Sequence, residues 1–209
     1  MSFYYKFNEI KVAIIINNND NIISRMEKKR IDTKTIVLAG LLTALTILLQ
    51  FLSTIIPTGV NLNLALVPIT LGAVLLGPYV GAFLGLVCGA VILLSPNTVT
   101  VFMAISPVGT ILACLLKTTI AGLLAGFVAK AFKEKNDLLS AVLASIIVPL
   151  VNTLIFAIIA YFFFLEGLGL SDFWSIFTVL IGLNFLFEIV TNVIISPTTY
   201  KVINQIKRN

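Results

Sequence analysis

From Thr35 onward, long apolar stretches alternate with short polar breaks along the chain. A helix needs about 20 predominantly apolar residues to cross a bilayer, and most of these stretches reach that length. The pattern predicts six transmembrane helices, over about residues 35–56, 64–76, 80–94, 105–132, 139–164 and 173–196. The second and third stretches are short, so they form either two short spans or one re-entrant hairpin.

Residues 1–33 differ from the rest because they are polar and basic. The apolar stretch Val12–Ile16 is too short to span a membrane or to form the core of a cleaved signal peptide. We therefore expect a disordered cytoplasmic tail over 1–33, a transmembrane domain over 34–203 and a second cytoplasmic tail over 204–209. Translation from Met26 is an alternative start for the first tail.

Composition supports a membrane protein. Of the 209 residues, 59% are hydrophobic and 11% are charged, whereas soluble domains carry about 25% charged residues. A soluble fold of this size buries only about 70–75% of its surface, so it could not hide this much apolar area. The expected fold class is an all-α integral membrane protein, a multi-pass protein of the cell membrane.

The placement of basic residues predicts the orientation. Cytoplasmic loops are rich in lysine and arginine. With six spans and a cytoplasmic N-terminus, 13 of the 14 basic residues lie inside, the exception being Lys117. The loops then left outside, at 57–63, 95–100 and 166–172, contain no lysine or arginine. Both termini are therefore expected in the cytoplasm.

Several kinds of chemistry are excluded or disfavoured. The chain has no histidine, the usual general base and commonest metal ligand. Cys88 and Cys114 lie in apolar stretches and form no zinc pattern. A phosphate-binding loop is absent, because the segment from Gly109 to Lys117 lacks the second glycine. We expect a protein that is not an enzyme, hydrolyses no ATP itself and carries no cofactor or metal.

Two ionisable residues lie deep in the apolar stretches. A lysine such as Lys117 costs about 2.5–3.5 kcal/mol near the middle of a span. Counted along straight helices, Glu188 lies at nearly the same depth, less than one turn away. The two residues either form an ion pair or line one cavity, and these alternatives are compatible.

Polar side chains recur at helical spacing in the last three stretches, and we expect them to surround a ligand cavity. Residues four apart share one face of a helix, and lipid would not tolerate such a polar face. The first three stretches offer almost no polar face. The residues that we expect to bind substrate from the late helices are Thr110, Lys117, Asn152, Asn184, Glu188 and Asn192.

Small residues also recur every four positions. They do so at Gly81, Gly85 and Gly89, at Gly122 and Gly126, and at Gly40 and Ala44. Such spacing allows helix backbones to approach closely. The last pair is surrounded by a lipid-type surface, which sets it apart from the others.

The segment Val60–Leu86, VNLNLALVPITLGAVLLGPYVGAFLGL, resembles the substrate-binding S components of energy-coupling factor (ECF) vitamin transporters. The most recognisable part is the spacing of Leu76-Gly77-Pro78, Gly81 and Gly85 after a short second helix. The resemblance extends over about 34–203 and lies in the pattern of hydropathy and glycines.

The resemblance implies a six-helix bundle that binds one vitamin or similar small molecule with high affinity. The ligand would lie among the late helices, under the loop between helices one and two, which adds Asn61 and Asn63 to the predicted site. The partners would be a membrane coupling subunit and its two ATPase subunits, with no nucleic acid. A small-residue pair on helix one is the usual docking surface, and it matches Gly40 and Ala44, with glycine where alanine is typical.

Two other function classes compete with this interpretation. A self-sufficient ion-coupled secondary transporter would use Glu188 as a proton or ion site, but the chain shows no internal repeat of the kind that many such transporters have. An intramembrane enzyme is disfavoured because histidine and acidic clusters are missing. The ligand stays open: Lys117 suits a carboxylate such as that of pantothenate, and the phenylalanines of the late helices suit a flat ring such as that of riboflavin or folate.

Overall fold

The computed structural model describes residues 33–55, 63–133, 136–178 and 182–208. The chain divides into two units, Met1–Val37 and Leu38–Asn209. Of the first unit the structure describes the helical residues 33–37, and the packing below is that of the second unit. The rest of the predicted N-terminal tail and the predicted site residue Asn61 lie outside the described residues.

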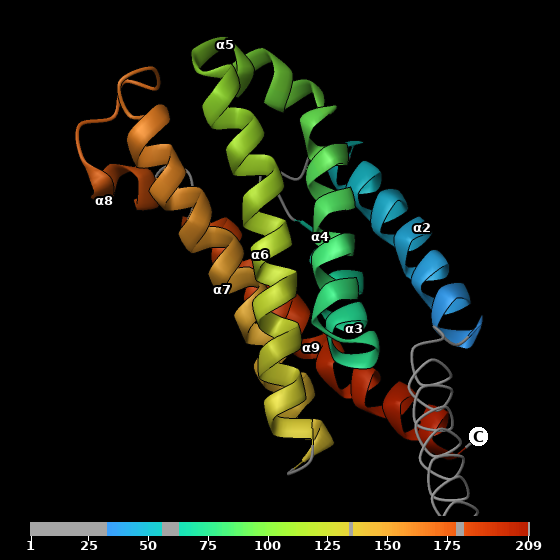
Figure 1. The fold of residues 1–209 in the computed structure, drawn as a ribbon. Helices are drawn as coiled ribbons and strands as arrows, with labels where there is room; N and C mark the ends of the chain where they lie inside the picture. Colours follow the sequence, from blue (N-terminus) through green and yellow to red (C-terminus); the bar gives the residue numbers. More distant parts are fainter. Residues whose placement is uncertain (1–32, 56–62, 134–135, 179–181, 209) are drawn as a thin grey trace, which may run out of the picture. The chain divides into compact units, whose positions relative to one another are not determined.

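Every regular element of the described residues is a helix (Figure 1). The prediction of an all-α membrane protein is confirmed, since three of these helices are long and apolar enough to cross a bilayer. The elements are α2 (Thr33–Ile55), α3 (Leu66–Leu76), α4 (Pro78–Leu93), η1 (Thr98–Phe102), α5 (Met103–Ile105), α6 (Pro107–Lys133), α7 (Asp137–Phe163), α8 (Phe173–Ile176) and α9 (Gly182–Arg208).

Local sequence explains where these helices begin. Gly77 separates α3 from α4 with φ of 97°, a conformation that suits glycine, and Pro78 then takes the first position of α4. The side chain of Asn136 accepts hydrogen bonds from the backbone N–H groups of Leu138 and Leu139, the second and third residues of α7. Asp172 forms a capping box with Ser175 at the start of α8.

Helices α2, α6 and α7 are each long and apolar enough to cross a membrane. The pair formed by α4 and the η1–α5 segment, bent by 71°, adds a fourth span if it crosses as one unit. Two shorter apolar helical segments, Leu66–Leu76 and Asn184–Ile195, complete the set. Six spans therefore stay a prediction, and the second apolar stretch is a short helix as expected.

The sixth apolar stretch contains α8 and α9, and residues 179–181 between them lie outside the described part of the chain. One continuous helix over 173–196 therefore stays a prediction. The depth of Glu188 counted from Phe173 stays a prediction with it. At its other end, α9 continues to Arg208, so the predicted tail at 204–209 begins within a helix.

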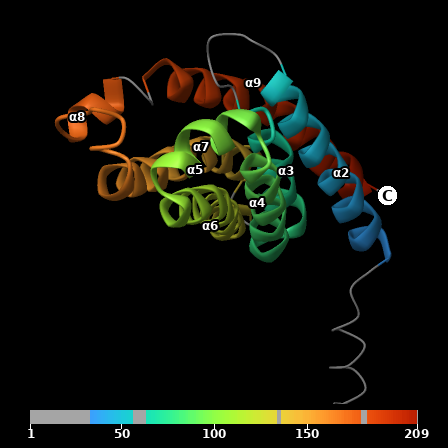
Figure 2. The ribbon, with the colours of Figure 1, turned by 90° about the horizontal axis from the view of Figure 1, so that it is seen from above.

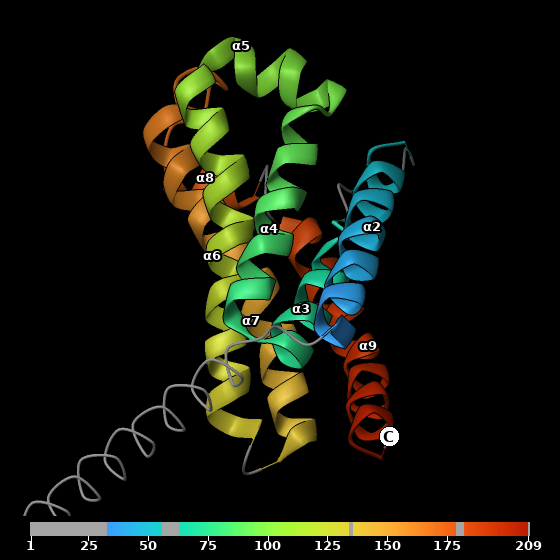
Figure 3. The ribbon, with the colours of Figure 1, turned by 45° about the vertical axis from the view of Figure 1, so that its right-hand side comes forward.

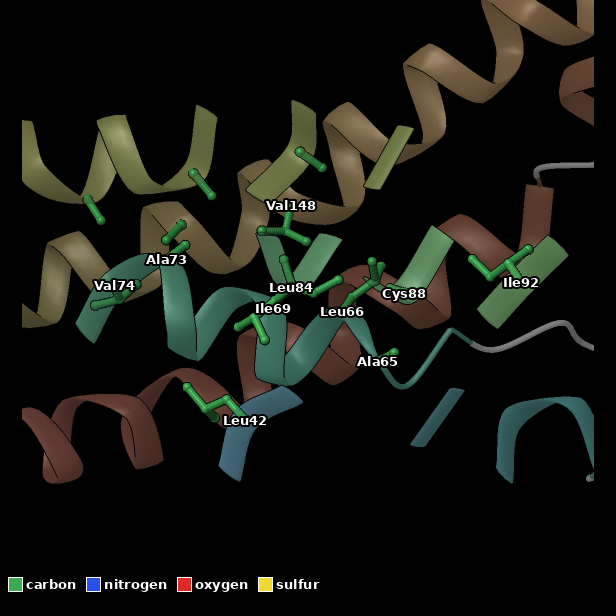
Figure 4. Close-up of a cluster of buried hydrophobic side chains, with 14 of the residues drawn as sticks. Leu42, Ala65, Leu66, Ile69, Ala73, Val74, Leu84, Cys88, Ile92 and Val148 are labelled. Carbon is green, nitrogen blue, oxygen red and sulfur yellow. The ribbon is translucent and has the colours of Figure 1, made fainter. Parts of the chain in front are cut away.

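Helix α3 is the centre of the packing. It contacts α4, α6, α7 and α9, and its side chains Leu66, Ile69 and Ala73 are almost completely buried. Figure 4 shows these side chains converging with Leu84 of α4 and Val148 of α7. The helix is shorter than a span, yet it is shielded from lipid by its neighbours.

Helices α4 and α6 meet along a seam of small residues, formed by Gly81, Gly85 and Gly89 on α4 with Gly122 and Gly126 on α6. A Cβ atom built at Gly81 would lie 2.6 Å from the carbonyl oxygen of Gly122. One at Gly85 would collide with the backbone of Thr118. The predicted close approach of backbones is therefore confirmed, and only glycine fits at these contacts.

Helix α2 is held differently, through side chains. No other described helix forms a close backbone seam with it, and it lies at the edge of its unit in Figures 2 and 3. Leu42 joins the hydrophobic core, and Thr46 and Gln50, four and eight residues further on, are buried. The helix therefore has one inner face and one open face.

Candidate functional site

Glu188 is the buried centre of the candidate site. The side chain lies on α9 and is 8% exposed. Its carboxylate accepts hydrogen bonds from the side-chain amide of Asn152 on α7 and from the backbone N–H of Asn63, and it interacts electrostatically with Lys117 on α6. Four predicted site residues from four separate segments are thus brought together, and we call Asn63, Lys117, Asn152 and Glu188 the Glu188 cluster.

Lys117 belongs to this cluster without a direct ion pair. Its Nζ lies 4.9 Å from the centre of the Phe156 ring, a cation–π contact that partly replaces water around the ammonium group. Within the described part of the chain, no direct ion pair joins the ammonium group to Glu188, although the two charges interact. Of the two predicted alternatives, a shared polar site therefore fits better than a closed ion pair.

Asn192 supports the cluster from one turn away on α9. Its Nδ2 donates to the backbone oxygen of Glu188 at 2.9 Å. Its Oδ1 lies 3.1 Å from the hydroxyl of Thr70, whose single proton serves both this oxygen and the carbonyl of Leu66. Both ends of the Asn192 amide have protein partners, so this residue ties α9 to α3.

The remaining predicted residues lie apart or have their hydroxyl or amide groups engaged elsewhere. The hydroxyl of Thr110 donates to the backbone oxygen of Ser106 at 2.8 Å. Thr110 is seven residues before Lys117, which is about two helical turns. Asn184 is half-buried one turn before Glu188 on α9. Asn61 lies outside the described residues.

The first three helices, which were expected to offer almost no polar face, each carry a buried polar side chain. These are Gln50 on α2, Thr70 on α3 and Cys88 on α4, and Thr70 contacts Asn192 of α9. The thiol of Cys88 donates to Oε1 of Gln50 at 3.4 Å and also interacts with the side chain of Asn63. These residues were missed because each is isolated within an apolar stretch. The spacing of Leu42, Thr46 and Gln50 was the signal that could have found the inner face of α2.

The predicted docking residues lie on the open face of α2, which we define as Gly40, Ala44, Ile47, Leu48 and Phe51. All five are exposed. A Cβ atom at Gly40 would meet nothing within 4 Å. This small-residue pair is therefore free of intramolecular packing in the described chain, unlike the seam between α4 and α6.

Comparison with known families agrees with this architecture. A family model of the substrate-specific component of ECF transporters matches residues 34–200. A search of curated proteins found no match, and a search of solved structures found none either. The family match covers α2 to α9 through most of their length, including all four residues of the Glu188 cluster. The chain therefore belongs to the substrate-specific components of ECF transporters, membrane-embedded subunits that bind a small-molecule substrate and work with a membrane coupling subunit and two ATPases.

Proposed function

We propose that this subunit captures a vitamin or similar water-soluble nutrient with high affinity and delivers it for ATP-driven import. In this role the chain is not an enzyme: it binds the ligand, and the ATPase subunits supply the energy. The Glu188 cluster is the observation that carries the proposal.

The free-energy cost of placing ionisable residues within membrane segments supports a binding role for the Glu188 cluster. Ionisable residues within membrane segments are expensive, and they mark substrate or ion pathways. Leaving a buried charge without good partners costs several kcal/mol, yet Lys117 and Glu188 are held near each other without a direct ion pair. A polar ligand that contacts both groups would offset this cost.

The open face of α2 is the proposed docking surface for the membrane coupling subunit. Small residues let a second helix approach closely. Gly40 and Ala44 are exposed in the described chain, and apolar neighbours such as Leu48 and Phe51 extend the surface. The position of this face, opposite the inner face that carries Gln50, would separate docking from ligand binding.

For the topology we propose six spans in the cell membrane with both termini in the cytoplasm. The basic residues of the α6–α7 connection and of the C-terminus support this orientation. Reporter fusions at Asp137 and at Gly169 should give opposite signals. Equal signals at the two positions would contradict the topology.

The proposed function is tested by purifying the full chain and identifying the co-purified small molecule by mass spectrometry. Uptake of that compound should require the coupling subunit and both ATPases. Uptake that persists without the ATPases would contradict the proposal and favour an ion-coupled transporter. A preparation that binds no small molecule would contradict a binding role of any kind.

A further inference from the structure

Several hydrogen-bond acceptors of the Glu188 cluster have no donor in the structure. The carboxylate of Glu188 receives hydrogen bonds from the Asn152 amide and the Asn63 backbone, but an ionised carboxylate has about four acceptor positions. Lys117 supplies the charged donor of the cluster, and it faces the Phe156 ring. Acceptor positions around Glu188 are therefore left over.

Asn152 adds an acceptor of its own. Since its NH₂ group donates to the carboxylate of Glu188, its amide oxygen must point elsewhere. That oxygen is buried and has no hydrogen-bond partner in the structure, and the whole residue is only 5% exposed. The opposite orientation of the Asn152 amide would place its oxygen against the carboxylate oxygens, which repel it. The amide oxygen is therefore the end of Asn152 that has no hydrogen-bond partner.

Asn63 repeats this arrangement just before α3. Its side chain interacts with the thiol of Cys88, and the thiol proton goes to Gln50. The sulfur is thus left as the acceptor for the NH₂ group of Asn63. The Asn63 side-chain oxygen is also buried without a hydrogen-bond partner. Two unpartnered amide oxygens therefore belong to residues that both hydrogen-bond to Glu188.

Buried acceptors without donors are uncommon in native proteins, and each one needs an explanation. Thr119 also has a buried, unpartnered hydroxyl oxygen, but it follows Lys117 by two residues and so points to a different side of α6. The acceptors next to Glu188 are distinct because they come from two segments and adjoin one charged group.

The charges of the cluster restrict what can bind there. Lys117 and Glu188 carry opposite charges, so a ligand with only one kind of polar end would leave one of the two groups without a partner. A ligand with two different ends satisfies both: an edge of N–H donors toward Glu188, and an acidic oxygen toward Lys117.

We propose that the ligand is a small molecule with two different polar ends. One end carries at least two N–H groups, which donate hydrogen bonds to Glu188, Asn152 and Asn63. The other end is an acidic group, which binds Lys117. This inference rests on the proposed function, because it names the substrate class of the same site. Hydroxyl groups could also donate hydrogen bonds to these acceptors, so the test compares ligands with N–H donors and ligands with O–H donors.

The ligand class is tested on the purified full chain in two steps. Mass spectrometry identifies the co-purified compound, and titration calorimetry then compares matched probes. Biotin and lipoate share an acidic chain, but only biotin has a ring with two N–H donors. Folate offers both ends. Pantothenate offers two hydroxyl groups and one amide N–H with an acid, and nicotinate offers an acid without an N–H donor.

We expect the co-purified compound and the tightest probe to carry both ends, and we expect lipoate and nicotinate to bind about 100-fold more weakly or worse. If the tightest compound lacks an edge of at least two N–H donors, this inference fails while the binding function stands; pantothenate, with two hydroxyl groups and a single amide N–H, is one such outcome. If nothing binds, the proposed function fails and this inference fails with it.

A variant tests the acceptors directly. Asn152→Leu should lower the affinity for the co-purified compound about tenfold or more while the ligand-free protein still folds. Ser145→Ala is the matched control on α7, because its buried hydroxyl already has a protein partner in Val142. Should Asn152→Leu not fold, Asn63→Ala provides the same measurement. Normal affinity in a folded variant would overturn the assignment.

Discussion

Two parts of this protein have the same small-residue spacing and opposite surroundings. In the seam between α4 and α6, a Cβ atom at Gly85 or Gly89 would collide with the backbone of the facing helix. On the open face of α2, a Cβ atom at Gly40 would meet nothing within 4 Å. Glycine at four-residue spacing therefore does not by itself distinguish internal packing from a surface for a partner.

The difference follows from how each helix is held. Helices α4 and α6 approach backbone to backbone, and this contact leaves no room for side chains. Helix α2 is held by side chains on its inner face, including Leu42 and Gln50. Its small residues Gly40 and Ala44 are on the other side, where both are exposed.

The same substitution should therefore have opposite consequences in the two regions. Gly85→Leu should destabilise the protein by about 3 kcal/mol or more, since the Thr118 backbone cannot move aside. Gly40→Leu should change stability by no more than about 0.5 kcal/mol. Thermal unfolding of both variants in the same detergent makes the comparison. Equal losses of stability would show that the open face is packed after all.

A double variant tests whether the open face of α2 is the docking surface for the coupling subunit. Gly40→Leu combined with Ala44→Leu should reduce ATP-dependent uptake at least about tenfold, because the close approach of a coupling helix is blocked. Ligand affinity of the isolated variant should stay within about twofold. Calorimetry on the purified variant is the control. A parallel loss of binding and uptake would mean that these residues serve internal packing.

The next prediction concerns the Glu188 cluster, which adjoins the seam because Lys117 directly precedes the seam residue Thr118. Removing one charge strands the other, at a cost of about 3–5 kcal/mol, so single variants inform only on folding. The double variant Lys117→Met with Glu188→Gln should fold and lose about tenfold or more in affinity. Titration of the purified double variant decides the point, and unchanged affinity would remove Lys117 from the site.

The smallest effect is expected on the inner face of α2. Gln50→Leu removes the acceptor of the Cys88 thiol, a weak hydrogen bond. We expect a stability change of about 1 kcal/mol or less. The affinity should fall only a few-fold, because Cys88 also contacts Asn63. Thr43→Val is a suitable control, since this half-buried hydroxyl bonds only to its own helix at Ala39. A loss as large as that of Gly85→Leu would mean that α2 is held as tightly as the seam.

Hydropathy and turn chemistry were enough to predict much of the fold. The bounds of α2, α6 and α7 fall within a few residues of the apolar stretches, because a membrane span must be apolar over a fixed length. Proline and glycine at 77–78 predicted the break between α3 and α4. In the sixth stretch the structure describes α8 and α9 on either side of residues 179–181, so the prediction of one helix there stays open.

The candidate site was predicted only in part, for a related reason. Four-residue spacing put Glu188 and Asn192 on one face of α9, because helix geometry is local. Thr70 and Cys88 could not be found in this way, since each is a single polar residue whose role depends on what it faces. Likewise the contact of Lys117 with the Phe156 ring depends on how α6 packs against α7.

The sequence alone determined that this chain is a helical membrane protein of the ECF substrate-specific type, with charged residues that its apolar stretches cannot expose to lipid. Only the tertiary structure decided which glycines are packed and which are open, and which acceptors around Glu188 lack donors. The physical reason is that periodicity fixes the face of a helix on which a residue lies, whereas packing decides what that face meets.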